Sequence, residues 1–295
     1  MVLTGPTGIG KTALSLELAE WLHSPILSCD SRQIYREMRI GTAAPTAAEL
    51  SRVTHYFIGS INMHDRYSAA RFEVDVLSLL NELFSTHDTV LMTGGSMMYI
   101  DAVCNGIDDM PDVDPILRTE LQARLKEEGL DALLAELSTL DPVYYARVDK
   151  SNPKRVLHGL EICLMTGKPF SSFHLHTPKQ RPFNIIKICL NMDRTLLYER
   201  IDKRVLQMVN NGLVEEARFL YPFKHLNALN TVGYKELFDY FDGQGTLDEA
   251  VTKIQFNTHK YARKQLTWFR RDPAYHWFAP DDFDAIKALI EQARV

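Results

Sequence analysis

The stretch Gly5-Pro6-Thr7-Gly8-Ile9-Gly10-Lys11-Thr12 follows a short apolar run, Val2-Leu3-Thr4, and precedes an amphipathic segment. It matches G-x-x-x-x-G-K-[ST], and a strand before it with a helix after it is the context that confirms a phosphate-binding P-loop. In such a loop backbone N–H groups surround phosphate oxygens, the lysine supplies positive charge, and the threonine hydroxyl can bind Mg²⁺. We therefore expect residues 5–12 to bind phosphate. A loop without a ligand is the less favoured alternative, since chance gives the pattern in roughly one chain in a hundred of this length.

Further short apolar runs alternate with helical patterns. One run, at residues 25–29, is closed by Asp30, another, at 89–92, runs into Gly94-Gly95, and a later strand is expected at 184–191. The segment 11–22 has leucines at helical spacing. This alternation predicts an α/β fold: a parallel sheet core flanked by helices on both faces, with the strand ends near the glycine loop.

A block of helical patterns interrupts this alternation. Helices are expected at 115–127, 130–137 and 153–165, the last one stopped by Gly167. The block lies between two strands of one sheet, which indicates an inserted, all-helical subdomain. The expected domains are therefore a P-loop α/β core with C-terminal helices, residues 1–111 and 183–295, and a helical insert, residues 112–182.

The composition is that of an ordinary globular protein, with 45% hydrophobic and 24% charged residues. No apolar run reaches the roughly 18 residues of a membrane span, and no leader pattern opens the chain, so we expect a cytoplasmic protein without a membrane role. The four cysteines form no CxxC pair, which argues against a disulfide framework or a zinc site and favours buried free thiols.

The net charge of −5 does not exclude a polyanionic partner, because binding depends on where charges lie. Residues 251–271 contain no acidic side chain but six basic ones. On a helix with about 3.6 residues per turn, one polar stripe collects several of them. The stripe comprises Lys253, Asn257, Lys260, Lys264, Thr267 and Arg271.

The carboxylates at the ends of the expected strands, one absent and one present, bear on the chemistry. The run at 89–92 leads into Thr93-Gly94-Gly95-Ser96 without the carboxylate that P-loop hydrolases use to hold their metal, so the loop is expected to hold phosphate without hydrolysing it. Asp30 ends another run, and the carboxyl ends of parallel strands converge on the ligand crevice. A carboxylate there can accept a proton from an attacking group. Alternatively, Asp30 could cap a helix or form a hydrogen bond to a residue that binds a metal ion.

Seven motifs in order resemble bacterial tRNA dimethylallyltransferases (tRNA isopentenyltransferases) over essentially the whole chain. They are GPTGIGKT at 5–12, CDSRQIY at 29–35, IGTA at 40–43, GGSMMY at 94–99, NPKRVLHGLE at 152–161, TVGYKE at 231–236 and RKQLTWFR at 263–270. The resemblance implies transfer of a dimethylallyl group from dimethylallyl diphosphate to N6 of the adenosine 3′ of the anticodon, with release of pyrophosphate. The partner would be the anticodon stem-loop of tRNA.

The resemblance also implies the roles of individual residues. The leaving pyrophosphate would be held by the loop, Lys11, Thr12 with Mg²⁺ as the cofactor, and a basic residue. For that residue we favour Arg204, with Arg200 as the alternative; either arginine could instead pair with a nearby acid such as Glu199 or Asp202. Asp30 would deprotonate the exocyclic amine, and Ser96, where the family more often has threonine, would share its hydrogen bonding.

The adenosine would have to leave its stack to reach the diphosphate. Gln33 offers the donor and acceptor pair that suits adenine, next to Ser31 and Arg32. The complete set expected to contact tRNA is Asp30, Ser31, Arg32, Gln33, Ser96, Arg118, Lys154, Arg155, Gly233, Tyr234, Lys264 and Arg270. Five basic residues of this set could instead be surface charges without a role in binding: Arg118, Lys154, Arg155, Lys264 and Arg270.

Fewer apolar residues precede Gly5 than in most members of the family. Either the first strand is short or the native start lies further upstream.

Two enzymatic alternatives remain: transfer to free adenine nucleotides, and a small-molecule kinase. A non-catalytic RNA-binding protein is the third. We expect a monomer that binds one tRNA and needs no protein partner.

Overall fold

The computed structural model describes residues 1–108, 110–111, 113–173 and 179–293. The chain divides into two compact units, one formed by Met1–Asn105 with Arg181–Val295 and the other by Gly106–Gln180. Asp112, the expected start of the insert, lies outside the described residues. The insert is expected to bind tRNA, since it carries Arg118, Lys154 and Arg155, and this role stays a prediction.

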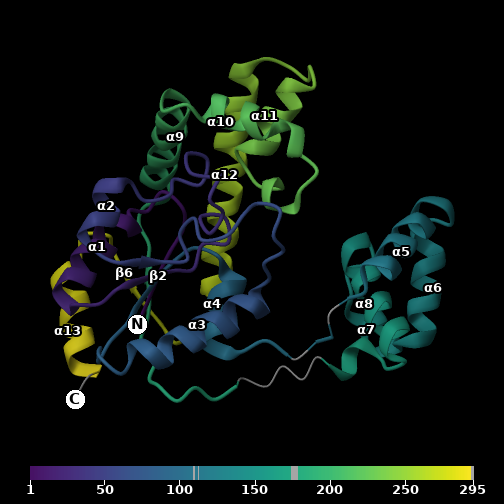
Figure 1. The fold of residues 1–295 in the computed structure, drawn as a ribbon, viewed down its shortest axis with the longest axis horizontal. Helices are drawn as coiled ribbons and strands as arrows, with labels where there is room; N and C mark the ends of the chain where they lie inside the picture. The colour runs from purple at the N-terminus through teal and green to yellow at the C-terminus, as the bar shows by residue number, and fades with distance from the viewer. Residues whose placement is uncertain (109, 112, 174–178, 294–295) are drawn as a thin grey trace. The chain divides into compact units, whose positions relative to one another are not determined.

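The larger unit contains a parallel sheet in the order β3-β2-β4-β1-β5-β6. Figure 1 labels two of its strands, β2 and β6, among the helices of this unit. The expected α/β fold with a parallel sheet flanked by helices is confirmed. Thr4 pairs with Gly94 on one side and with Cys189 on the other, so the central strands end level with one another. The strands are β1 (Val2–Thr4), β2 (Ile26–Ser28), β3 (His55–Tyr56), β4 (Leu91–Gly94), β5 (Lys187–Leu190) and β6 (Tyr275–Phe278).

Helices cover both faces of this sheet because its central strands are apolar on both sides. Along β1, Val2 packs in one apolar cluster with Phe72 and Ile100, whereas Leu3 packs in the other with Leu18. The helices of this unit are α1 (Lys11–Leu22), α2 (Ala47–Arg52), α3 (Ala69–Leu83), α4 (Met97–Asn105), α9 (Arg194–Asn210), α10 (Leu213–Leu220), α11 (Tyr234–Phe241), α12 (Leu247–Phe269) and α13 (Phe283–Ala293). Short 3₁₀ turns lie at Tyr221–Phe223 and Asn227–Leu229.

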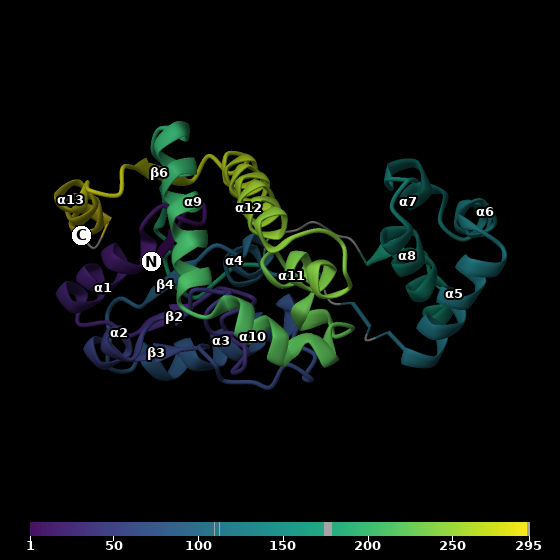
Figure 2. The ribbon, with the colours of Figure 1, turned by 90° about the horizontal axis from the view of Figure 1, so that it is seen from above.

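Helix α12 packs against α9 and α11 (Figure 2). Its N-terminus is fixed by a capping box between Thr246 and Glu249. The buried positions of α12 include Ile254, Ala262 and Gln265. None of the helices among the described residues is both long and apolar enough to cross a membrane.

The smaller unit is a helical bundle with its own apolar core, formed by residues such as Leu121, Leu133 and Leu160. Gly159 leaves room for Tyr144, since a Cβ at this position would lie 2.6 Å from a carbon of the Tyr144 ring. Its helices are α5 (Pro115–Glu127), α6 (Leu130–Leu140), α7 (Pro142–Arg147) and α8 (Pro153–Thr166), followed by a 3₁₀ turn at Phe170–Ser172.

Candidate active site

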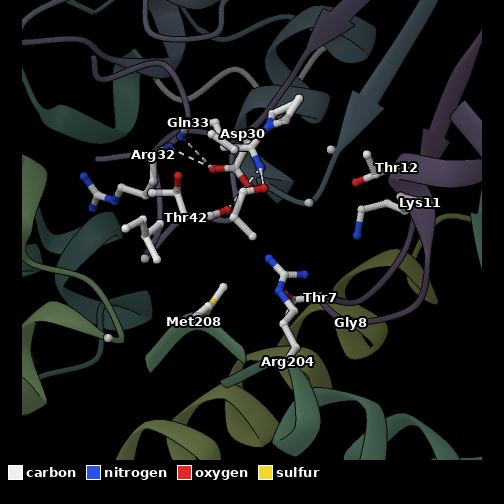
Figure 3. A pocket seen from close by; sticks show the side chains of 18 of the residues that line it. Thr7, Gly8, Lys11, Thr12, Asp30, Arg32, Gln33, Thr42, Arg204 and Met208 are labelled. Atoms are coloured by element: carbon white, nitrogen blue, oxygen red, sulfur yellow. Dashed lines mark hydrogen bonds between the residues drawn. The ribbon is translucent and has the colours of Figure 1, made fainter. Parts of the chain in front are cut away.

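A pocket of about 1610 Å³ lies in the larger unit, where β1, β2 and β4 end (Figure 3). The loops that leave these three strands carry residues 5–10, 29–33 and 95–96, which the level strand ends bring to one edge of the sheet. Helices α9 and α12 supply further walls through residues such as Arg204 and Tyr261. The glycine loop and Asp30, far apart in the sequence, therefore line one pocket.

The glycine loop leads into α1 with backbone that only glycine adopts easily. Gly8 and Gly10 have φ angles of +81° and +106°, and a Cβ on Gly8 would lie 2.7 Å from the Ile201 side chain. Gly10 caps α1 without a side-chain hydrogen bond. The first N–H groups of the helix are thus left for a ligand, and the positive end of the helix dipole favours an anion there.

Lys11 is held by the loop that it serves. Its Nζ donates to the carbonyl oxygens of Gly5 and Pro6, both at 2.9 Å. Burial, with repulsion from Arg204, lowers the pKa of Lys11 to about 8. The Thr12 side chain is exposed at the same helix end, and its hydroxyl makes no hydrogen bond within the described parts of the chain.

Asp30 and Ser96 come from neighbouring strands and meet through Ser31. Oδ1 of Asp30 accepts hydrogen bonds from the backbone N–H groups of Arg32 at 2.8 Å and Gln33 at 3.3 Å. Oγ of Ser96 accepts from the Ser31 N–H at 2.8 Å and donates to Ser31 Oγ at 3.0 Å. Among the described residues Oδ2 of Asp30 has no hydrogen-bond partner, so it is available to a ligand in the pocket.

The two candidate arginines lie one turn apart on α9 but differ in exposure. Arg204 is half-buried and points into the same space as Lys11 (Figure 3), and burial lowers its pKa while Asp30 partly offsets this effect. Arg200 is exposed, with its guanidinium against Gly10. Neither arginine forms an ion pair within the described ranges, and Asp202 instead lies 2.8 Å from Nε2 of His259.

Known proteins resemble the chain over nearly its full length. The model of the family "IPP transferase" matches residues 33–272. The chain belongs to the IPP transferase family. A tRNA dimethylallyltransferase 2 of Porphyromonas gingivalis is 62% identical over 280 residues, which covers 95% of this chain and 93% of that protein. A tRNA dimethylallyltransferase 2 of Parabacteroides distasonis is 58% identical over 99% of this chain and 98% of its own.

A solved structure agrees with this family membership. The full-length tRNA isopentenylpyrophosphate transferase from Bacillus halodurans superimposes with a TM-score of 0.73 at 34% sequence identity. The match covers 99% of this chain and 95% of that one. The family resemblance seen in the seven motifs is therefore confirmed.

In this IPP transferase family chain, some expected RNA-reading residues are already engaged within the protein. Nε2 of Gln33 donates to the carbonyl oxygens of Thr42 and Ala43, both at 3.1 Å, and its Oε1 accepts from Ser28 at 3.4 Å. Arg32 donates to the carbonyl of Asn227 at 3.2 Å. That Gln33 reads the adenine edge stays a prediction, and it would require exchange of these bonds.

Tyr234 differs more clearly from the expectation of an RNA contact. Its side chain is fully buried, and its hydroxyl donates to Oε1 of Glu216 at 2.7 Å. The same carboxylate accepts from the N–H groups of Ile40 at 2.8 Å and Gly41 at 2.9 Å. In this arrangement the Tyr234 side chain holds the pocket loop at residues 39–41, and Gly233 beside it lines the pocket. A contact of either residue with RNA stays a prediction.

The other expected RNA contacts are not among the residues that line this pocket. Lys264 and Arg270 are exposed on or next to α12, and Lys154 and Arg155 are exposed at the start of α8 in the helical unit. Arg118, in the same unit, instead forms a two-pronged ion pair with Glu161 at 2.7 and 2.8 Å. Its guanidinium thus has a structural partner, and its role toward RNA stays a prediction.

Residues from α12 complete the pocket, and no motif in the sequence indicated their place there. Gln265 is 1% exposed and bonds to two pocket loops, and the Tyr261 hydroxyl donates to the Gly95 carbonyl at 3.4 Å. The only signal in the sequence was that Gln265 occupies an apolar position between exposed basic residues in RKQLTWFR.

The residues present fit a Mg²⁺ ion that arrives with a phosphate ligand. Within the described parts of the chain there is no group of three or more His, Cys, Asp or Glu residues suited to a metal. The exposed Thr12 hydroxyl next to the loop is one available oxygen ligand. Mg²⁺ commonly takes its other ligands from substrate phosphates and water, so a dedicated protein cage is not required.

Proposed function

We propose that this chain transfers the dimethylallyl group from dimethylallyl diphosphate to N6 of the adenosine 3′ of the anticodon in tRNA, with release of pyrophosphate. The observation that carries the proposal is a single pocket lined by both the P-loop and the available Asp30 carboxylate. It is supported by family membership and by the names of the relatives, which are tRNA dimethylallyltransferases.

The leaving group is bound at the P-loop end of this pocket. As the C–O bond of the donor breaks, its electron pair passes to the pyrophosphate oxygen, and the new negative charge meets Lys11, Arg204 and the first N–H groups of α1. A Mg²⁺ ion held by Thr12 and the diphosphate would add charge neutralisation at this end. No water molecule has to be activated, so the lack of a carboxylate after β4 is consistent with this chemistry.

The acceptor amine reacts at the Asp30 end. The N6 lone pair forms the new bond to the allylic carbon, and the N6 proton passes to the Asp30 carboxylate, which deprotonates the nitrogen as its positive charge develops. Two backbone N–H groups hold Oδ1, which aims the carboxylate while Oδ2 stays available. Ser96 fixes the neighbouring Ser31, and in this role it supports the position of Asp30.

The adenosine has to be extruded to reach this pocket, at a cost that is lowest in a single-stranded loop. The exposed basic residues of α12 are suited to the phosphates of the stem-loop, because none of them forms an ion pair in the described structure. The proposal places the protein in the cytoplasm with its tRNA substrate, as a monomer.

The experiment that tests the proposal offers several acceptors in parallel. The protein is incubated with Mg²⁺, radiolabelled dimethylallyl diphosphate and unmodified tRNA, free AMP or free ATP. We expect label in tRNA alone. Label in the nucleotides would contradict the tRNA assignment and support the free-nucleotide alternative. No label in any acceptor would contradict the transferase and favour the kinase or the RNA-binding protein.

A further inference from the structure

The side chain of Gln265 joins two walls of the pocket. Its Oε1 accepts a hydrogen bond from the Thr7 N–H of the P-loop at 2.9 Å, and its Nε2 donates to the Gly95 carbonyl at 2.8 Å. These partners lie 258 and 170 residues away in the sequence. One amide from α12 thus connects the loop for the leaving group with the loop that carries Ser96.

The orientation of this amide is determined by its partners. The Thr7 N–H can only donate and the Gly95 carbonyl can only accept, so a flipped amide would face a donor with a donor and an acceptor with an acceptor. A neutral side chain that bonds to both loops from this position needs one donor and one acceptor atom at its end, as the glutamine amide has. Gln265 is 1% exposed, and a buried amide without both bonds would be destabilising.

The link continues from Gly95 to the proton acceptor. Ser96, the next residue, binds Ser31 through its Oγ at 2.8 Å, and Ser31 follows Asp30 directly. A change in the Gly95 loop therefore reaches Asp30 through the hydrogen bonds between Ser96 and Ser31 and the peptide bond between Ser31 and Asp30. On its other side, Gln265 sets the first half of the P-loop, whose later N–H groups face the phosphate site.

We infer that Gln265 is a positioning residue, which fixes the distance between the diphosphate loop and the Asp30–Ser96 end of the pocket. The inference rests on the proposed function for its effect on transfer. Its effect on anion binding can be measured without any acceptor. Since a misplaced reacting group slows catalysis strongly, the side chain influences the rate without touching the reacting atoms.

Two substitutions address the same contact from opposite sides. Gln265→Met keeps the length of the side chain but removes both bonds. Gly95→Ala should leave the backbone at residue 95 unchanged, because Gly95 does not have a positive φ. The new Cβ would, however, collide with Nε2 of Gln265. Only the end of a flexible side chain has to move, so Gly95→Ala is expected to fold. Gln255→Met is the matched control, since Gln255 lies on α12 and does not line the pocket.

The measurements are affinity for inorganic pyrophosphate by calorimetry, affinity for an unmodified anticodon stem-loop, and kcat and KM for transfer. For Gln265→Met we expect a loss of roughly tenfold in both pyrophosphate affinity and kcat, with stem-loop affinity within about twofold of wild type. Gly95→Ala should give losses of the same kind. The double variant should be no worse than the weaker single variant within about twofold, because both changes disturb the hydrogen bonding of the same side chain.

Pyrophosphate affinity and kcat of Gln265→Met equal to those of Gln255→Met would overturn the inference, and so would additive losses in the double variant. If Gln265→Met does not fold, Gly95→Ala decides alone: unchanged pyrophosphate affinity overturns the inference, and a loss supports it. Failure of the proposed function is distinguishable, since it would appear as absent transfer by the wild type whatever the pyrophosphate data show.

Discussion

The ammonium of Lys11 lies near enough to the guanidinium of Arg204 for their repulsion to help burial lower the pKa of Lys11 to about 8. Two cations are thus kept close together in a pocket, where an anion between them relieves their repulsion. Because Lys11 loses its charge above this pKa, pyrophosphate affinity should fall as pH rises through about 8. Calorimetric titrations across this range, with Lys11→Met as the control, should show the fall in the wild type only.

The stability of the fold should respond to Lys11 in the opposite direction. Its pKa is about 8 in the folded chain against the ordinary 10.5, so between these values the unfolded chain holds a proton that the folded chain has released. The contribution of Lys11 to the free energy of unfolding therefore rises with pH in this window. Urea titrations of wild type and Lys11→Met isolate it; equal pH slopes would contradict the assigned pKa.

Arg204 and Arg200 can be separated by identical substitutions. Arg204→Gln removes the half-buried cation that shares the space with Lys11, and we expect kcat to fall by about a hundredfold, the size seen when one donor to a developing oxyanion is lost. Arg200→Gln removes an exposed charge and should cost less than about tenfold. Steady-state kinetics at saturating tRNA decide between them, and the reverse order would assign the role to Arg200.

The bond between Tyr234 and Glu216 should stabilise the loop at residues 39–41. Tyr234→Phe removes a buried hydrogen bond to a carboxylate, and we expect the free energy of unfolding to drop by about 1–2 kcal/mol. Tyr240→Phe is the control, as the Tyr240 hydroxyl has no hydrogen bond within the described residues, and it should change stability by less than about 0.5 kcal/mol. Equal losses in urea titrations would argue against the contact.

In the helical unit, Arg118 and Glu161 form an ion pair. Its loss should lower the free energy of unfolding more than it weakens RNA binding. Burial raises the pKa of Glu161, but hydrogen bonds from Arg118 and His158 outweigh it and bring the pKa to about 2. The ionised Glu161 carboxylate therefore stabilises the folded chain at pH values above its ordinary pKa of 4.5, and this stabilisation is lost as pH falls toward 2. Arg118→Ala should cost about 1–3 kcal/mol, since the arginine is partly exposed.

The exposed Lys154 supplies the comparison for RNA binding. Lys154→Ala should weaken binding of the stem-loop without a change in unfolding free energy. If Arg118→Ala weakens RNA binding as much as Lys154→Ala under conditions where both are folded, then Arg118 also contacts RNA. Unchanged RNA affinity in the folded Arg118→Ala variant would leave it a purely structural role.

Local signals predicted much of the fold. The strand at Val2–Thr4, the helix at Lys11–Leu22 and the helix at Pro115–Glu127 are confirmed, because a glycine loop or an Asp-Pro start marks their ends. Gly167 ends α8 in the left-handed conformation, as expected. The strand expected at 89–92 lies at Leu91–Gly94, and the one expected at 184–191 shortens to Lys187–Leu190.

What the sequence did not reveal depends on contacts between distant residues. The strands at His55–Tyr56 and Tyr275–Phe278 are short edge strands without a clear apolar run, so no local pattern marks them. The places of the P-loop and Asp30 at one edge of the sheet were predicted because they follow from the strand ends, whereas their roles stay predictions. Gln265 and Glu216 were missed, since their partners, mostly backbone groups, are brought near only in the folded chain.

In the proposed reaction, Asp30 takes the proton of the acceptor amine while the P-loop holds the leaving group. Single-turnover transfer by Asp30→Asn, at saturating tRNA and donor, tests it most directly, because the asparagine oxygen can still accept from the Arg32 and Gln33 N–H groups. We predict a rate lower by about a hundredfold or more, with affinities for pyrophosphate and stem-loop within about twofold. Transfer at the wild-type rate would contradict the account.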